Sequence, residues 1–217
     1  MSKNQSIHGK FITIEGADGA GKSTQALRLK EYLQEKGYET VLTREPGGTR
    51  IGEQVREILL NPESKYIDFK TEVLLYAACR SQLLKEVIIP ALMDGKIVIS
   101  DRFVDSSIAY QGYARDIDLS FVKKINRLIV GEFFPDITVF LDVPVQTGLG
   151  RNRDKGRAID RLESEDINFH QRVYDGFKEL ALKNQRFYIV NGSESEDLVF
   201  AEIVKIVAEK LLVESNE

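Results

Sequence analysis

The fold of this chain is decided by residues 11–23, which read FITIEGADGAGKS. Phe11–Ile14 is a short apolar run typical of a buried strand, and residues 16–23 match the pattern G-x-x-x-x-G-K-[ST]. Thr24–Lys36 follows with apolar residues at helical spacing. A glycine-rich loop between a strand and a helix turns backbone N–H groups toward phosphate oxygens, and the helix N-terminus adds positive potential. The sequence therefore predicts a nucleotide phosphate site.

Two side chains of this loop and one acid farther along the chain have the chemistry that a phosphate site needs. Lys22 supplies a mobile positive charge for the β- and γ-phosphates, and the Ser23 hydroxyl can ligate Mg²⁺. Asp101 directly follows the predicted strand Ile97–Ser100, where open parallel sheets bind their ligands. We expect Asp101 to help hold Mg²⁺, although an Asp after a strand is also a common helix cap.

Short β-rich runs alternate with longer helical patterns, which predicts a parallel sheet covered by helices on both faces, an α/β fold. The expected strands are Phe11–Ile14, Thr40–Thr43, Ile97–Ser100, Ile137–Leu141 and Phe187–Val190. The expected helices are Thr24–Lys36, Glu72–Met93 with a bend or end near Pro90, Leu119–Val130 and Val199–Leu212. We expect residues 1–217 to form one domain.

Composition excludes several classes of protein. The 217 residues have a net charge of −4, which disfavours a protein that coats nucleic acid. The single cysteine, Cys79, excludes an internal disulfide and a Cys-rich zinc site, and two histidines are too few for a metal cluster. The N-terminal residues do not resemble a signal peptide, and the apolar runs are too short to span a membrane. We expect a cytoplasmic protein without a membrane or nucleic-acid partner.

Three further segments carry groups suited to a second, smaller anion, namely Thr43–Thr49 after the second predicted strand, Asp101–Ser107 after the third, and the helix with Tyr76 and Arg80. Tyr76 and Arg80 lie four residues apart and so share a helix face, as do Ser107 with Gln111 and Ser106 with Tyr110. An aromatic plate, guanidinium groups, hydroxyls and an amide could stack a base, bind its polar edge and hold a monophosphate. Each could also be an ordinary core tyrosine or a polar residue on a helix surface. The phosphate loop and Asp101 indicate an NTPase or a kinase, and these groups together bear on which kind it is.

These motifs resemble those of the bacterial thymidylate kinase family. The resemblance rests on EGADGAGKSTQ, TREPGGT, LLYAACR and DRFVDSSIAYQGYAR, and it extends over about residues 11–174. It implies a P-loop NTPase fold with a five-stranded parallel sheet flanked by helices, usually assembled as a homodimer. The implied reaction transfers the γ-phosphoryl group of ATP to dTMP, with Mg²⁺, to give dTDP and ADP for dTTP synthesis.

The resemblance also implies a role for each matching residue. The loop would hold the ATP phosphates through Gly16, Ala17, Asp18, Gly19, Ala20, Gly21, Lys22, Ser23 and Thr24. Asp18 would approach the 3′-hydroxyl side of the acceptor, Glu45 and Arg56 would lie near the acceptor nucleotide, and Arg102 would bind the dTMP phosphate. Tyr76 would stack on thymine, with Arg80, Ser107 and Gln111 at the polar edge of the base. Tyr110 would crowd the position of a ribose 2′-hydroxyl, beside Ser106.

A basic run in an acidic chain has two interpretations. Residues 150–161 read GRNRDKGRAIDR and have a local charge of +3. Alone, such a run is usually a solvated loop. The family, however, places its catalytic arginine either in the phosphate loop, which has no basic group at Ala17, Asp18 or Ala20, or in a mobile lid. We therefore expect an Arg-rich lid at about residues 148–161, with Arg157 or Arg153 as the catalytic arginine.

Three alternatives remain open from the sequence. The first is another nucleoside-monophosphate kinase that takes dUMP or UMP. The second is a non-catalytic P-loop switch of the GTPase type, which lacks support because no Asn-Lys-x-Asp tetrapeptide occurs. The third is an ATP-binding module without turnover, which the presence of Lys22, Asp101 and Arg102 disfavours.

Overall fold

The structure, a computed structural model, describes residues 9–154 and 159–212. Its centre is a five-stranded parallel sheet in the order β2-β3-β1-β4-β5. The strands are β1 (Lys10–Glu15), β2 (Thr40–Arg44), β3 (Ile97–Asp101), β4 (Ile137–Asp142) and β5 (Phe187–Asn191). Each predicted strand is present and slightly longer than expected, so the predicted α/β fold with a parallel sheet is confirmed.

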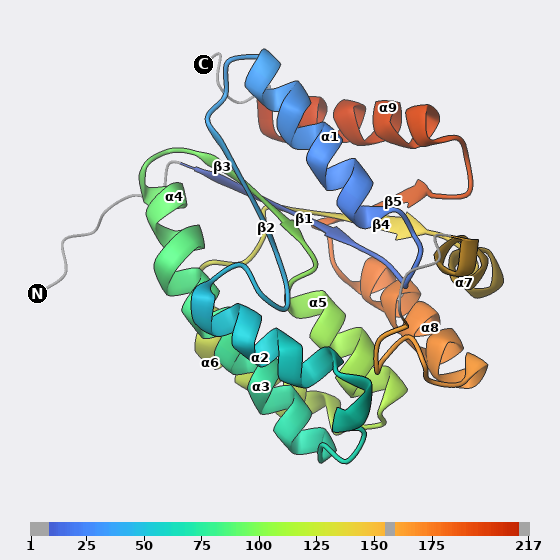
Figure 1. Cartoon of the computed structure of the whole chain (residues 1–217). Helices are drawn as coiled ribbons and strands as arrows, with labels where there is room; N and C mark the ends of the chain where they lie inside the picture. The colour runs from blue at the N-terminus through green and yellow to red at the C-terminus, as the bar shows by residue number, and fades with distance from the viewer. Residues whose placement is uncertain (1–8, 155–158, 213–217) are drawn as a thin grey trace, which may run out of the picture.

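Helices cover both faces of this sheet (Figure 1). Helices α1 (Lys22–Glu35) and α9 (Glu196–Val207) lie side by side on one face. The other face packs against α3 (Phe69–Leu83), α6 (Leu119–Val130) and α8 (Ile167–Lys183). The remaining elements are α2 (Arg50–Leu60), which packs on α3, η1 (Pro62–Ser64), η2 (Leu84–Ile88), α4 (Ile89–Met93), α5 (Val104–Ser107), η3 (Ile108–Ala114), α7 (Val145–Asp154) and η4 (Ala208–Leu212).

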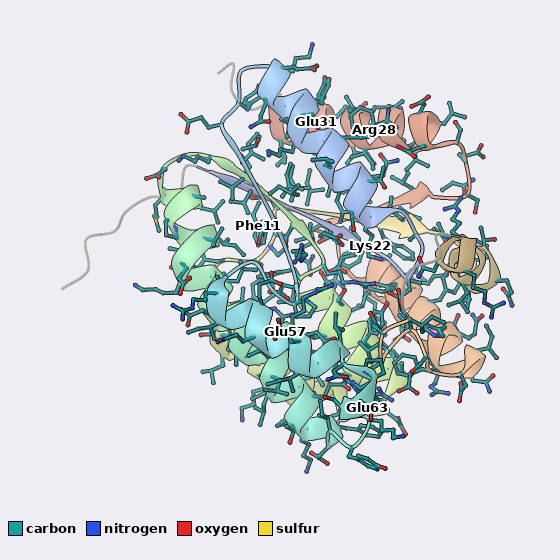
Figure 2. All side chains as sticks on the ribbon, viewed as in Figure 1. Phe11, Lys22, Arg28, Glu31, Glu57 and Glu63 are labelled. Atoms are coloured by element: carbon teal, nitrogen blue, oxygen red, sulfur yellow. The ribbon has the colours of Figure 1, made fainter. Side chains whose placement is uncertain are left out.

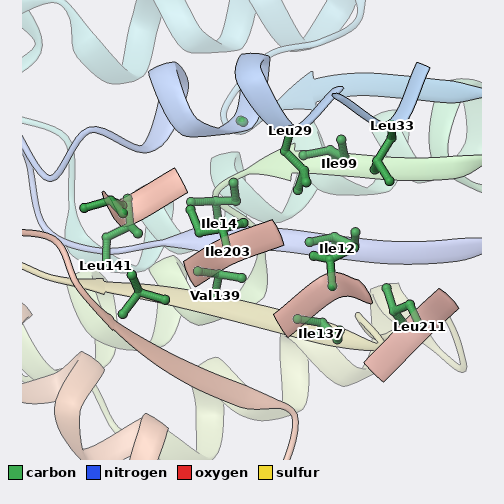
Figure 3. Close-up of a cluster of buried hydrophobic side chains, with 14 of the residues drawn as sticks. Ile12, Ile14, Leu29, Leu33, Ile99, Ile137, Val139, Leu141, Ile203 and Leu211 are labelled. Carbon is green, nitrogen blue, oxygen red and sulfur yellow. The ribbon is translucent and has the colours of Figure 1, made fainter. Parts of the chain in front are cut away.

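The central strand β1 is buried on both faces, which explains its nearly continuous apolar sequence. Ile12 and Ile14 point into the core between the sheet and the helices α1 and α9 (Figure 3). Thr13 points to the opposite face, where its hydroxyl lies 2.9 Å from that of Thr138. Side chains of alternate residues of β1 therefore pack against the two opposite helical layers.

The long helix predicted at Glu72–Met93 is continuous but not regular. It begins at Phe69, because the Asp68 side chain caps it by accepting hydrogen bonds from the backbone N–H groups of Lys70 and Thr71. A π-helical turn, η2, precedes α4, which contains Pro90. Proline lacks an N–H and its ring crowds the carbonyl four residues earlier, so a widened turn before it is expected.

The segment expected as a lid contains more regular structure than a loop. Its first part is helical, because α7 extends to Asp154. Residues 155–158, and with them Arg157, lie outside the described residues. Arg161, at the far end, is buried, and its Nε donates to the carbonyl of Leu59 at 2.7 Å. Arg161 is therefore an anchor inside the protein rather than a residue of an exposed loop.

None of the helices within the described ranges is long and apolar enough to cross a membrane.

Candidate active site

The phosphate loop joins the end of β1 to the start of α1, at the edge of the sheet where parallel strands present their carboxyl ends. Gly21 precedes the first helical residue with a φ of 91°, which favours glycine. Gly19 must lack a side chain for a steric reason, because a Cβ there would lie 1.9 Å from the carbonyl oxygen of Gly148 in α7. The loop is thus packed directly against the helix that leads to the predicted lid.

Lys22 and Ser23 begin α1 and face the same cavity (Lys22 is labelled in Figure 2). Lys22 is buried, and its Nζ donates to the loop carbonyl of Ala17 at 2.7 Å. Burial and the neighbouring guanidinium of Arg102 lower the pKa of Lys22 to about 8. Because burial makes its charge costly, the Lys22 ammonium gains from exchanging the carbonyl of Ala17 for a negatively charged phosphate oxygen.

The predicted metal ligands lie together. The Ser23 Oγ donates to Asp101 Oδ2 at 2.5 Å. In the part of the chain that is described, no group of three or more His, Cys, Asp or Glu side chains could hold a metal ion by itself. A hydroxyl and one carboxylate fit Mg²⁺, which keeps several waters and phosphate oxygens in its coordination shell.

A cavity of about 320 Å³ extends from the phosphate loop toward α3 and η3. Of the residues that the sequence predicts for the site, those that line it are Asp18, Gly19, Gly21, Lys22, Ser23, Thr24, Glu45, Arg56, Tyr76, Arg80, Asp101, Arg102, Ser106, Ser107, Tyr110 and Gln111. The lining also includes residues that the sequence did not single out, namely Arg44, Pro46, Leu60, Asn152, Asp160, Leu162 and Glu163. The structure thus brings the phosphate loop and the predicted acceptor residues into one cavity.

Four predicted loop or lid residues lie elsewhere. Gly16, Ala17 and Ala20 form the back of the phosphate loop without lining the cavity. Arg153 is exposed on α7 and does not line the cavity either. Its neighbour Arg151 donates from Nη1 to the carbonyl of Gly192 at 3.0 Å, which ties α7 to the segment after β5.

Arg102 links the two halves of the cavity. It has a φ of 71°, an unusual value for a residue other than glycine, and its backbone N–H donates to the carbonyl of Ile14. Its guanidinium donates to the carbonyl of Gly16 at 3.0 Å and to Ser106 Oγ at 3.2 Å. The planar group also lies over the ring of Tyr110, 4.9 Å from its centroid. These contacts fix a cation beside the phosphate loop.

Asp18 is held by three groups rather than directed at open space. Arg102 Nη2 lies 2.5 Å from its Oδ1, the Tyr110 hydroxyl donates to its Oδ2 at 2.9 Å, and His170 Nδ1 lies 3.9 Å away. Burial would raise the pKa of Asp18, but the cations of Arg102 and Lys22 outweigh it and lower that pKa. Asp18 therefore organises the cations around the phosphate loop as well as lining the cavity.

Glu15, which the sequence analysis did not single out, supports the turn that carries Arg102. Its Oε1 accepts from the backbone N–H groups of Phe103 at 2.7 Å and Ser106 at 3.3 Å, and the Ser106 hydroxyl donates to its Oε2 at 2.6 Å. Burial, followed by the charge of Asp105, raises the pKa of Glu15 to about 8. The sequence signal that could have identified Glu15 is an acid that ends an apolar strand directly before a phosphate loop.

Arg80 and Glu45 form a buried pair in the wall of the cavity. Arg80 Nε donates to both oxygens of Glu45 at 3.1 and 3.0 Å, and its Nη1 donates to Asn126 Oδ1 at 2.5 Å. Arg80 Nη2 also donates to Ser107 Oγ at 3.0 Å. Burial raises the pKa of Glu45 against the opposing effect of Arg80. Most donors of Arg80 are thus occupied by protein acceptors, which leaves few for a ligand.

Tyr76 and Arg56 complete the same wall. Tyr76 is 9 % exposed and packs in the cluster that includes Ile108 and Phe169. Tyr76 is thus packed into the core and also lines the cavity. Arg56 donates from Nη1 to the carbonyl of Pro46 at 2.7 Å. Arg56 also lines the cavity, where its guanidinium could meet an anion.

Gln111 is held by Glu72, a second acid that the sequence analysis missed. Gln111 Nε2 donates to Glu72 Oε1 at 2.8 Å, and Arg161 Nη2 lies 2.7 Å from Glu72 Oε2. Glu72 precedes Tyr76 and Arg80 by four and eight residues on α3, so helical spacing could have placed all three on one face. The wall of the cavity is therefore supported by a buried network of charged side chains.

Comparisons with known proteins identify close similarity over most of the chain. The family model for thymidylate kinase matches residues 14–203. A thymidylate kinase of Geobacillus sp. strain WCH70 is 44 % identical over 207 residues, covering 94 % of this chain and 99 % of that protein. A thymidylate kinase of Exiguobacterium sibiricum is 48 % identical over 200 residues, covering 92 % and 94 %. The crystal structure of thymidylate kinase from Ehrlichia chaffeensis superposes with a TM-score of 0.75 at 39 % identity, covering 92 % and 98 %.

Proposed function

The chain belongs to the thymidylate kinase family, and on that premise we propose which of its residues carry out the reaction. The chain is a kinase that transfers the γ-phosphoryl group of ATP to dTMP, giving dTDP and ADP. The observation that carries the assignment of residues is the single cavity lined by both the phosphate loop and the wall formed by Tyr76, Arg80 and Gln111. Two nucleotides bound at its two ends would bring their phosphates together near Lys22 and Arg102.

The donor end of the cavity is the phosphate loop. Residues 16–24 hold the ATP phosphates through their backbone N–H groups, and Lys22 leaves the carbonyl of Ala17 to contact the β- and γ-phosphates. Ser23 and Asp101 fit Mg²⁺, which would neutralise charge on the phosphates when bound. The 2.5 Å contact between these two side chains supports this use of them.

The acceptor end of the cavity is the wall formed by residues of α3 and η3. Tyr76 stacks on thymine, and Gln111, with Arg80 and Ser107 beside it, faces the polar edge of the base. Arg102, positioned by Asp18 and Ser106, binds the 5′-phosphate of dTMP. Tyr110, fixed by its hydrogen bond to Asp18, fills the space next to the sugar, while Glu45, buried in the wall, and Arg56 lie near the acceptor nucleotide.

Catalysis rests on position and charge. The dTMP phosphate is already an anion, so it needs little activation by a base, and the barrier is lowered by holding the two phosphates in line. Lys22 and Arg102 place positive charge around the transferring group. When the lid at about residues 148–161 closes, one of its arginines, Arg157 or Arg153, adds a further positive charge there. Closure also excludes water, which would otherwise compete with dTMP as acceptor.

The proposal also covers the domain organisation, the oligomeric state and the location of the protein. Residues 1–217 act as one kinase domain, the protein works as a homodimer, and it meets its substrates in the cytoplasm. The family resemblance supports the dimer, and the two charged nucleotides, which do not cross membranes unaided, support the location. Sedimentation of the purified chain at micromolar concentration tests the dimer, since a monomer mass would contradict it.

Release of ADP in a coupled assay tests the function directly. With saturating ATP and Mg²⁺, we expect dTMP to support turnover with the highest kcat/KM among dTMP, dUMP and UMP, and GTP to replace ATP poorly. The Lys22→Ala variant is the matched control for contaminating kinases. Turnover that does not depend on dTMP, or that survives in this variant, would contradict the assignment.

A further inference from the structure

Glu72 is fully buried directly behind the wall of the cavity and does not itself line the cavity. Its carboxylate meets side chains that arrive from other parts of the chain. Oε1 accepts from Gln111 in η3, while Oε2 lies 2.7 Å from Arg161 Nη2 and 3.5 Å from Arg115 Nη2. A carboxylate between two guanidinium groups offers only acceptors to its neighbours. Phosphoryl transfer from ATP to dTMP does not itself require such a group.

The partners of Glu72 are themselves fixed. Arg161 donates from Nε to the carbonyl of Leu59, and its backbone N–H donates to the carbonyl of Leu60. Arg115 Nη2 lies 2.6 Å from Glu165 and its guanidinium lies over the ring of Phe169. The carboxylate therefore cannot turn away from Gln111 without breaking several other contacts.

This arrangement decides which way round the amide of Gln111 lies. Nε2 must face Glu72, because Oε1 in its place would put two acceptors against each other. Gln111 lines the cavity, so it offers a ligand the two groups that remain, the Oε1 acceptor and the second N–H donor of Nε2. The amide of Gln111 therefore complements a base whose edge has a hydrogen-bond donor opposite Oε1 and an acceptor opposite Nε2.

Pyrimidine bases differ in that edge. Thymine and uracil carry the N3–H donor beside the O4 acceptor, whereas cytosine carries the N3 acceptor beside the N4 amino donor. We propose that Glu72 is a positioning residue that selects the base: by fixing the amide of Gln111, it makes the site complementary to dTMP and rejects dCMP. The inference rests on the proposed function, in which Gln111 meets the polar edge of the base.

The substitution Glu72→Gln turns this into a sharp expectation. The guanidinium of Arg161 lies 2.7 Å from Oε2 in the native chain, and its positive charge attracts the amide oxygen and repels the NH₂ group, so the new amide directs its oxygen to Arg161 and its NH₂ group toward Gln111. Gln111 then reverses, turns Oε1 toward residue 72 and presents N–H to the N3 position. That reversed edge matches cytosine, so a nearly isosteric change of one buried atom should move the preference between two substrates.

The test measures kcat/KM for dTMP, dUMP and dCMP at saturating ATP. We expect Glu72→Gln to lower the dTMP-to-dCMP ratio by about 100-fold or more, because one substrate loses and the other gains a matched pair of hydrogen bonds in a buried site. The values for dTMP and dUMP should fall together, and KM for ATP should stay near that of the native chain. Parallel loss for all acceptors with an unchanged ratio would overturn the proposal.

Two further variants test whether a change in the dTMP-to-dCMP ratio comes from the contact of Glu72 with Gln111. One controls for the general effect of neutralising a buried carboxylate, and the other tests whether Gln111 meets the base. Asp105→Asn neutralises another buried carboxylate, which is paired with Arg186 at 2.7 Å and does not line the cavity, and it should leave the ratio unchanged. Gln111→Leu removes the amide itself and should collapse the ratio. A ratio that moves in Gln111→Leu but not in Glu72→Gln overturns the role of Glu72 alone, and a ratio that moves in neither overturns the placement of the base as well.

A further variant covers the case in which Glu72→Gln does not fold. Glu72→Met combined with Arg161→Met replaces the ion pair by apolar side chains of similar volume, which often preserves stability, and Arg115 keeps its contact with Glu165. The amide of Gln111 is then free to take either orientation, so the dTMP-to-dCMP ratio should narrow. A ratio equal to that of the native chain in this variant overturns the proposal.

Discussion

Arg80 and Glu45 are joined by an ion pair in which Arg80 Nη2 lies 2.5 Å from Glu45 Oε2, and both side chains are almost completely buried. The pair connects α3 to the loop that follows β2 and places a guanidinium in the wall of the proposed acceptor site. Because most of the donors of Arg80 are satisfied within the protein, the residue has a structural role that its position in a sequence motif does not reveal.

We therefore expect Arg80→Ala to affect both folding and substrate binding. Removing one partner of a buried pair leaves Glu45 without its cation, which costs about 3–5 kcal/mol of the free energy of unfolding. KM for dTMP should also rise far more than KM for ATP, since Arg80 lies at the acceptor end of the cavity. Urea unfolding and steady-state kinetics measure the two effects. Unchanged stability would show that the pair contributes little, and equal rises of both KM values would contradict the acceptor role.

How much of this site could be predicted depends on the distance over which its residues interact. The phosphate loop, Asp101 and the pair Tyr76 and Arg80 are local patterns, so the sequence alone singled them out, and the structure places them around one cavity. The pairing of Arg80 with Asn126, or of Glu72 with Arg161, joins residues far apart in the chain, and such contacts leave no local signal. Charge and helical spacing could indicate that these residues matter, but not which partner each one meets.

The interval 148–161 shows a different limit. Its basic character and its position predicted a lid, yet charge gives no information about where a helix ends or which residue turns inward. The structure extends α7 to Asp154 and buries Arg161 against the end of α2. The helix α7 begins close to the phosphate loop because it follows β4, which pairs with β1, and the close approach of Gly148 to Gly19 needs glycines in two distant segments.

Lys22→Ala should lower kcat by about 10³-fold or more, because a charge that stabilises the transferring phosphoryl group in a desolvated site is lost. The fold should survive, since Lys22 makes one hydrogen bond to its own loop and its charge is costly to bury. Lys36→Ala, at the other end of the same helix, is the matched control and should leave kcat unchanged. Turnover of Lys22→Ala close to that of the native chain would contradict the role of the phosphate loop.

The raised pKa of Glu15 makes stability depend on pH. Its folded-state pKa of about 8 is above the ordinary value of 4.5, so between these two values the folded state binds more protons than the unfolded state. The stability that Glu15 contributes is thus fully present below about pH 4.5 and is lost as the pH rises through about 8. Glu15→Gln mimics the neutral form, and we expect it to remove a fall in unfolding free energy of several kcal/mol across this range.

Denaturant unfolding at several pH values between 5 and 9 measures that slope. The control is Glu57→Gln, which removes an exposed carboxylate on α2 (labelled in Figure 2) and should leave the slope unchanged. Equal slopes in Glu15→Gln and in the native chain would show that Glu15 is ionised throughout, and the acid could then not be the source of the pH dependence.

The arginines of the proposed lid give the last prediction. An arginine that acts on charge present mainly in the transition state should change kcat and leave both KM values nearly unchanged. Arg151 is occupied by the carbonyl of Gly192, whereas Arg153 is exposed, which makes Arg153 the freer of the two described arginines of α7. We therefore expect Arg151→Ala to cost little, and Arg153→Ala or Arg157→Ala to lower kcat by about 10³-fold.

The triple variant decides between one acting arginine and a general effect of charge. If a single arginine acts, the combined substitution of Arg151, Arg153 and Arg157 by Ala should lose about as much kcat as the worst single variant. A loss divided evenly among the three would instead favour a diffuse electrostatic contribution, which added salt should weaken because exposed charges are screened. A triple variant with native kcat would show that the basic run is a solvated loop, and that Lys22 and Arg102 supply the protein's positive charge at the transferring group.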